Sequence, residues 1–227
     1  MELFENVAFQ VALLVVVVFI ALFIVSRKIY EQKLRTSIRK GDMEKYGKLL
    51  NSFFAVILLE PNRVNLLRAI YSLDINNSKQ ADLDLAKVNF RRLKGDEKGL
   101  YVQTASTIAM NNKDKKLFAQ IKSVIDELEK TGNEQIMVKQ LQQEYKINKK
   151  LYFDFDNTVI DDLKEIIDNC DNEMTKGMMS ISLAKAYHLN KQDDMAKKTL
   201  NKAKEYVKGS SYESVINDIS KNLKFLD

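Results

Sequence analysis

The segment Leu151–Val159 reads LYFDFDNTV, and its residue types and spacing come closer to a catalytic motif than those of any other part of the chain. Three apolar or aromatic residues precede Asp154, and Asp156 and Thr158 follow at intervals of two. Carboxylates can serve covalent or acid–base catalysis and can bind a divalent metal ion. Whether they do so here depends on the elements that position them.

The segment resembles the first motif of haloacid-dehalogenase-type phosphatases, an apolar strand that ends in D-x-D-x-T. The resemblance implies that Asp154 is the nucleophile, that Asp156 is the general acid and base, and that both help to bind Mg²⁺. Such an enzyme also needs a doubly wound sheet after the motif, with a Ser or Thr, a Lys and an acidic pair. Only 68 residues follow Val159, and they read as helices.

We therefore prefer to interpret this segment as a link between two helices. In that case its aromatic residues pack inward, and an acidic or amide side chain caps the next helix. The residues concerned are Tyr152, Phe153 and Phe155 for the packing and Asp156 or Asn157 for the cap.

A single cysteine and a single histidine leave little room for metal or triad chemistry. Cys170 cannot form an intramolecular disulfide or a CxxC metal site, and it has no obvious base beside it. His188 follows Tyr187 near the end of a predicted helix, where it could line a groove or act as a C-terminal helix cation. No P-loop, HExxH or EF-hand pattern is present. We expect a non-enzymatic protein without metal or cofactor.

The segment 8–25 reads AFQVALLVVVVFIALFIV, in which 14 of 18 residues are Leu, Ile, Val or Phe and none is charged. As a helix it would span about 27 Å, close to the roughly 30 Å of a bilayer core. A cleaved signal peptide needs a basic start and a small-residue cleavage site. The start, MELFENV, has neither Lys nor Arg, and Ser26-Arg27-Lys28 follows the segment. We predict a transmembrane helix over 8–26.

Basic residues flank this helix on one side only. They follow it in a predicted juxtamembrane helix, 27–41, which contains a single acidic residue, Glu31. The positive-inside rule then predicts an exported N-terminus, 1–7, and a cytoplasmic C-terminal domain, in a single-pass cell-membrane protein. The basic residues could also contact anionic headgroups, but we interpret them as the topology signal. They are Arg27, Lys28, Lys33, Arg35, Arg39 and Lys40.

Composition favours an all-α fold for the remainder, because one proline, seven glycines and 30% charged residues suit long helices better than turn-rich sheets. The net charge of +5 is spread along the chain and does not indicate nucleic-acid binding. Short polar links and Pro61 mark the ends of the expected helices. These helices are 27–40, 42–60, 62–75, 78–94, 97–112, 114–131, 133–149, 156–170, 172–190, 193–208 and 211–225.

The expected helices pair into about five hairpins of 32 to 40 residues plus a capping helix, which indicates a helical repeat domain over 42–227. Within 177–210, a Leu-Ala-x-Ala-Tyr string is followed by small and large residues at helical spacing. This pattern resembles the tetratricopeptide repeat, although Ser180 stands where that family has Trp. The residues are Leu183, Ala184, Ala186, Tyr187, Ala196, Leu200 and Ala203. Weaker likenesses are Tyr101, Ala105, Ile108, Leu117, Ile121 and Val124, and Leu49, Phe53 and Val56 before Pro61-Asn62.

The resemblance implies a concave surface that binds a peptide or helix of a protein partner. By analogy with the family, this surface would contain Val102, Ser106, Ala109 and Met110 in one unit and Met178, Ile181, Lys185 and His188 in another. We expect a membrane-tethered adaptor whose contacts are a protein and the lipid bilayer. The alternatives are the phosphatase and an extracytoplasmic helper of protein secretion. The richness in Lys, Asn and Ile suggests an AT-rich bacterial genome.

Overall fold

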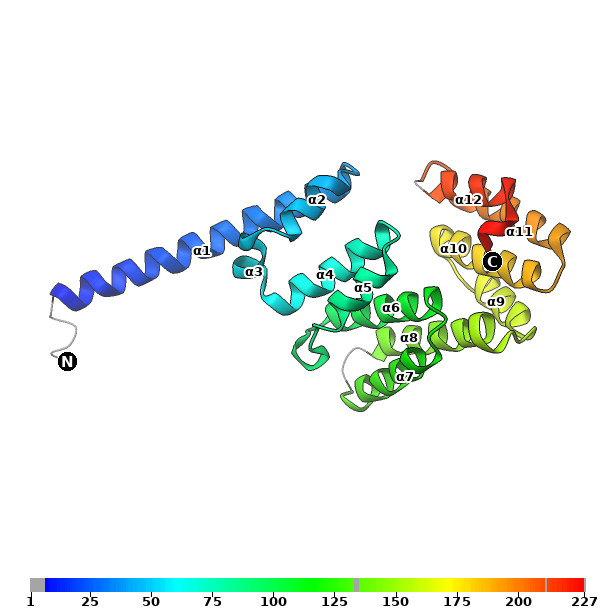
Figure 1. The fold of residues 1–227 in the computed structure, drawn as a ribbon, viewed down its shortest axis with the longest axis horizontal. Helices are drawn as coiled ribbons and strands as arrows, with labels where there is room; N and C mark the ends of the chain where they lie inside the picture. The colour runs from blue at the N-terminus through cyan, green and yellow to red at the C-terminus, as the bar shows by residue number, and fades with distance from the viewer. Residues whose placement is uncertain (1–6, 133–134, 211, 227) are drawn as a thin grey trace. The chain divides into compact units, whose positions relative to one another are not determined.

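The computed structural model describes residues 7–132, 135–210 and 212–226, and in these residues the chain is helical without any strand (Figure 1). They form twelve α-helices and the short segments η2, η3 and η4. The predicted all-α fold is confirmed. The predicted exported N-terminus, 1–7, lies outside the described residues apart from the backbone of Val7. The chain divides into two compact units, Met1–Asn112 and Lys113–Asp227.

Helix α1, Val7–Arg39, is continuous, so the predicted transmembrane and juxtamembrane helices are one helix. No Pro or Gly interrupts this stretch. The apolar side chains favour lipid and the basic side chains that follow favour water, but the helical backbone continues through both. The C-terminal part of α1 is part of the core of the first unit through buried Tyr30 and Leu34. Gly41, with φ of 68°, ends the helix.

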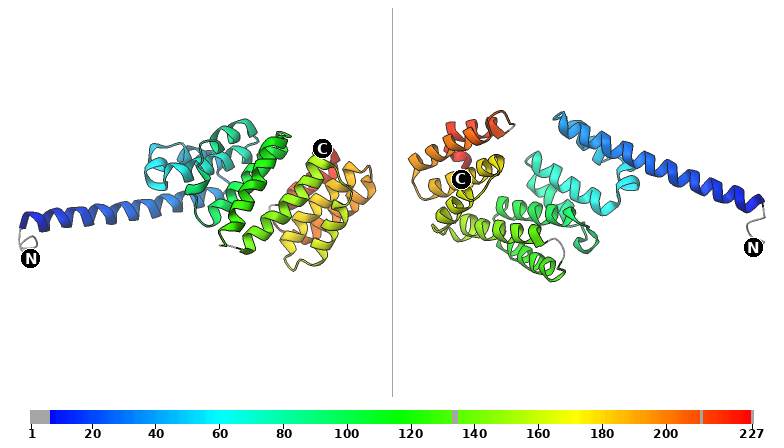
Figure 2. Two further views of the ribbon diagram at one scale, coloured as in Figure 1. Left: turned by 90° about the horizontal axis from the view of Figure 1, so that it is seen from below. Right: turned by 180° about the vertical axis from the view of Figure 1, so that it is seen from behind.

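The predicted helix 42–60 is two helices, α2 (Met43–Leu50) and α3 (Phe53–Leu59), lying beside the C-terminal part of α1 (Figures 1 and 2). Asp42 caps α2 by accepting a hydrogen bond from the Lys45 amide at 3.0 Å. Ser52 caps α3 in the same way, accepting from the Ala55 amide at 3.3 Å. Because a new helix begins after Ser52, the side chains of α3 point in directions that differ from those of a continuous helix 42–60. The buried residues of α3 are Ala55, Leu58 and Leu59. Phe53 and Val56, which belong to one of the weaker repeat-like patterns, are both exposed.

The rest of the first unit consists of α4 (Pro61–Asp74), α5 (Ser78–Leu85), η2 (Phe90–Arg92) and α6 (Asp96–Asn111). Pro61 opens α4 as predicted, at a position where its missing amide hydrogen is not needed. The predicted helix 78–94 ends early, at Leu85, and the chain continues as a turn that buries Val88 and Leu93. Helices α4, α5 and α6 pack on one another.

The second unit contains α7 (Lys115–Lys130), α8 (Gln135–Asn148), the π-helix η3 (Lys149–Asp154), α9 (Val159–Asp168), α10 (Glu173–Leu189), α11 (Asp193–Tyr206), α12 (Tyr212–Lys221) and η4 (Leu223–Leu226). Helix α10 packs on both α9 and α11. One apolar core joins α8 through η4, and Leu163 and Leu200 are completely buried within it.

The α10–α11 hairpin contains the small residues that suggested a close helix pair. Ala184, Ala196 and Ala203 are all buried. Gly177 on α10 lies against α11 so closely that a Cβ atom there would overlap Cγ1 of Val207. Small residues therefore line the contact between α10 and α11.

Candidate functional site

Helix α1 contains the first candidate site, a stretch of apolar side chains exposed on every side. From Val11 to Val25 the large apolar residues are all exposed, Phe19 to 72%. Among the described residues, α1 is the one helix that is long and apolar enough to cross a membrane, a property that a signal sequence shares. Such a surface is unfavourable in water and favourable in lipid.

The predicted basic flank lies on the same helix directly after the apolar stretch. Five of its six residues are exposed, and Arg27 is half-buried. Arg27 pairs with Glu31 of its own helix at 3.4 Å and with Glu60, at the end of α3, at 3.9 Å. Arg27 therefore also fixes α3 to α1, and the exposed residues remain to face the membrane surface or solvent: Lys28, Lys33, Arg35, Arg39 and Lys40.

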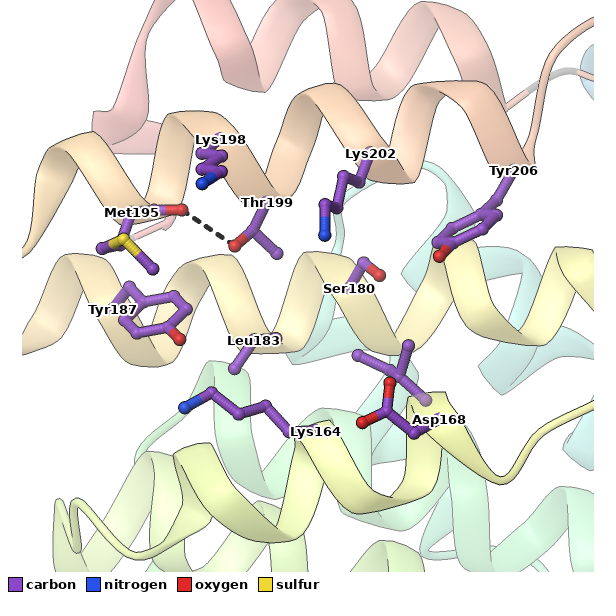
Figure 3. A pocket seen from close by; sticks show the side chains of 11 residues that line it. Lys164, Asp168, Ser180, Leu183, Tyr187, Met195, Lys198, Thr199, Lys202 and Tyr206 are labelled. Carbon is purple, nitrogen blue, oxygen red and sulfur yellow. Dashed lines mark hydrogen bonds between the residues drawn. The ribbon is translucent and has the colours of Figure 1, made fainter.

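The second unit contains a groove of about 280 Å³ walled by α9 and α11, with α10 as its floor. Figure 3 shows the side chains of Lys164 and Asp168 on one wall, Lys198 and Lys202 on the other, and Tyr206 at one end. Leu183 and Tyr187 of α10 lie between the walls. The complete lining is Lys164, Ile167, Asp168, Ser180, Leu183, Tyr187, Met195, Lys198, Thr199, Lys202 and Tyr206.

The groove is positively charged, because its lining has three lysines and one aspartate. Lys198 and Lys202 are exposed, and no described carboxylate lies within ion-pair distance of either. Lys164 lies over the Tyr187 ring, with Nζ 5.9 Å from the ring centroid. The Tyr187 hydroxyl and the Asp161 carboxylate, whose Oδ1 lies 3.5 Å from Lys164 Nζ, both raise the pKa of the Lys164 ammonium. Ammonium groups beside the Leu183 side chain and the Tyr187 ring suit an anionic group attached to an apolar body.

The structure distributes the predicted partner-binding residues over both units. Val102, Ser106 and Ala109 are buried in α6 of the first unit, and Met110 is half-buried. On α10 of the second unit, Met178 is exposed and Ile181 half-buried. Lys185 Nζ lies 4.7 Å from the centroid of the Tyr152 ring, and His188 Nδ1 lies 2.7 Å from Asp193 Oδ1.

The groove uses another face of α10 from the one predicted. At about 100° per residue, Ser180, Leu183 and Tyr187 point about 150° away from the predicted set on this helix. Sequence reasoning missed Lys198 and Lys202, whose spacing of four places both on one face of α11. That spacing, next to the Tyr187 hairpin, is the signal that could have identified them.

The Asp154–Asp156 segment forms a turn between helices. The strand that the phosphatase resemblance implies is instead the π-helix η3. Asp154 Oδ2 lies 3.2 Å from Lys149 Nζ. Asp156 Oδ1 accepts a hydrogen bond from the Thr158 amide at 2.9 Å, which lowers the pKa of the Asp156 carboxyl. Among the described residues no group of three or more His, Cys, Asp or Glu side chains could hold a metal ion.

The aromatic residues of this segment divide between core and surface. Phe153 is buried and Tyr152 half-buried, as the linker interpretation predicted. Phe155 is 66% exposed, so the prediction that it packs inward is wrong. Its left-handed backbone, with φ of 52°, reverses the chain at the end of η3 and turns its side chain out of the core.

Comparison with protein-family models, curated proteins and solved structures gives no match to this chain. Its class therefore follows from its own fold and sites. It is a helical protein with one candidate membrane helix, and that helix continues into the core of its first helical unit. Its second unit contains a basic groove.

Proposed function

We propose that this protein is a non-enzymatic adaptor, anchored by α1, that binds an acidic segment of a protein partner in the groove of its second unit. The observation that carries the proposal is the pair of exposed lysines on the α11 wall, Lys198 and Lys202, neither of which has a described carboxylate within ion-pair distance. The groove is at or below the small end of small-molecule sites, which are roughly 300–1,000 Å³. This size favours one or two side chains of a partner over a cofactor.

The anchor holds the adaptor at the membrane, and the way it joins the first unit supports a rigid attachment. The Tyr30 hydroxyl donates to the Leu49 carbonyl at 2.5 Å and lies 2.7 Å from the Ser52 hydroxyl. A helix continued into a core transmits its orientation, unlike a flexible linker. Tethering also raises the effective concentration of the groove near membrane-bound partners.

Orientation follows from the one-sided basic flank. By the positive-inside rule, both units lie in the cytoplasm and the N-terminus is exported. In the alternative, an extracytoplasmic helper of secretion, the protein has the same groove, but the groove lies on the outer side of the membrane.

The finer fold that we propose is a tetratricopeptide-like array of about five hairpins with a C-terminal capping helix. Support comes from the α10–α11 pair, with its buried small residues, and from the α4–α5 pair, which buries Ala69 and Ala81. Both are antiparallel neighbours joined by short turns, the unit from which helical solenoids are built.

The groove can be tested by site-specific photo-crosslinking in intact membranes. A photoreactive residue replaces Met195, an exposed lining residue, in the full chain. We expect a discrete protein adduct that the K198E/K202E variant loses by about tenfold or more, because two attractions become repulsions.

The matched control is K197E/K204E, which makes the same change in net charge on another face of α11. We expect it to retain the adduct. Equal loss in both variants would show that only the general charge of the helix matters, and the groove proposal would then fail.

A further inference from the structure

Helix α3 has an apolar face with no protein cover. Its exposed residues lie on one side of the helix, centred about 170° from its buried residues at 100° per residue. No charged residue lies between Asn51 and Glu60. The exposed fractions are 75% for Phe53, 63% for Phe54, 37% for Val56 and 47% for Ile57.

Both ends of α3 are held at one turn of α1. At its start, the Ser52 hydroxyl lies 2.7 Å from the Tyr30 hydroxyl, and at its end Glu60 Oε1 lies 3.9 Å from Arg27 Nη1. Arg27 is two residues beyond Val25, the end of the apolar stretch, and Tyr30 is five residues beyond it. At 1.5 Å per residue, these contacts lie about 3–8 Å beyond the apolar stretch.

This level coincides with the interfacial layer of a bilayer. The headgroup region adds roughly 5–8 Å to each side of the hydrocarbon core. A helix held at this level next to a membrane span is surrounded by headgroups and the first acyl carbons. Helices with apolar aromatic faces bind in that layer.

We infer that the exposed face of α3 inserts into the headgroup–acyl boundary of the leaflet where α1 leaves the membrane. The inference rests on the proposed anchor. Lipid is the occupant because α3 is packed against α1 directly beside the exposed apolar surface of the span. The opposite face of α3, through Ala55, Leu58 and Leu59, is fixed in the core that includes Tyr30 and Leu34, so α3 cannot turn its aromatic residues inward.

The inserted face would give the protein a second contact with the membrane beside its span. A single helix can rotate about its axis and tilt, whereas a span with a lateral interfacial helix is fixed in both respects. The first unit would then stand at a defined angle on the membrane surface.

Tryptophan fluorescence tests this inference, because the chain contains no Trp. Single-Trp variants F53W and F54W of the full chain are reconstituted in phosphatidylcholine–phosphatidylglycerol vesicles, with lipids brominated either high or deep in the acyl chain. We expect blue-shifted emission that falls by about half with the shallow quencher and less with the deep one. The control in the same unit is L83W, at an exposed position on α5, which we expect to stay unquenched.

A fourth variant, F19W, separates the inference from the anchor on which it rests. If the deep quencher reduces F19W emission while F53W and F54W emit as in water, the anchor stands and the inference is overturned. A third outcome is that F53W and F54W emission is blue-shifted, is not quenched by any brominated lipid, and shifts further as the protein concentration rises. This outcome would show that a second copy of the chain covers the α3 face, and it would also overturn the inference. Failure of F19W to be quenched would remove the anchor itself.

Discussion

Arg63 Nη1 of α4 lies 2.9 Å from Glu31 Oε1 of α1, and Glu31 is six residues beyond the end of the apolar stretch. Glu31 also forms an ion pair with Arg27, and Arg63 forms a second ion pair with Glu97 of α6 at 3.3 Å. This network connects α1 to two further helices of the first unit. The two central side chains, Glu31 and Arg63, are only 24% and 32% exposed. Solvent therefore screens the attraction between their charges less than in an ordinary surface ion pair.

We expect E31Q and R63Q each to destabilise the α1–α4 contact by about 1 kcal/mol, because each removes the half-buried ion pair that joins the two helices. Amide hydrogen exchange in α4 and in the C-terminal part of α1 measures the local loss. A double-mutant cycle should give a coupling of about 0.5–1 kcal/mol. The control pair is Glu44 and Lys48, whose side chains are 80% and 75% exposed. A coupling as large in that pair would contradict a special role for the network.

Gly177 should not tolerate a methyl group. G177A gains up to about 1 kcal/mol of helix propensity, but its Cβ would overlap the buried, β-branched Val207. Overpacking of this kind costs about 1–3 kcal/mol, so we expect a net loss of about 1–2 kcal/mol in thermal unfolding followed by circular dichroism.

The compensating double variant G177A/V207A tests the cause of that loss. It should cost less than the sum of its two single substitutions, because the smaller side chain at position 207 makes room for the new methyl group. Additive costs would show that the G177A effect does not come from the contact with Val207.

Tyr46 should make the first unit sensitive to alkali. Burial raises the pKa of Tyr46 to about 12, the charge of Asp74 adds to the rise, and Arg63 opposes it. The folded state then keeps the phenol proton between pH 10 and 12, whereas the unfolded chain releases it. Folding therefore binds more protons in this window, and stability falls as pH rises through it.

The Y46F variant lacks this proton and should lose less stability than the wild type over the same interval. Unfolding midpoints on either side of the window measure the difference. Parallel pH profiles of the two proteins would show that Tyr46 ionises as easily in the fold as in the unfolded chain.

Local signals in the sequence predicted most of the helix ends. Gly41 and Pro61 impose backbone conformations that do not depend on the rest of the fold, so the breaks at these residues were predictable. The break at Ser52 was not, because Ser is also tolerated inside helices. It is fixed by the Tyr30 hydroxyl, which comes from a residue 22 positions earlier.

The groove was harder to predict than the helices that form it. The α10–α11 pairing follows from small residues at helical spacing, which any close helix pair needs. Which face of α10 lines the groove depends on where α9 and α11 pack, and this is a tertiary property. The family analogy therefore selected Met178 and Lys185, while the groove is lined by Ser180, Leu183 and Tyr187.

Labelling of Cys170 tests most directly the claim that α1 holds both units at the inner membrane face. Cys170 is the only cysteine of the chain and is half-buried, with Sγ 3.6 Å from the Asn172 carbonyl. A membrane-impermeant maleimide is applied to intact cells that express the protein and to inverted membrane vesicles prepared from them. An E2C variant in a C170S background serves as the control for the opposite side. We predict that Cys170 reacts only in inverted vesicles and E2C only in intact cells, whereas labelling of Cys170 in intact cells would contradict the cytoplasmic adaptor.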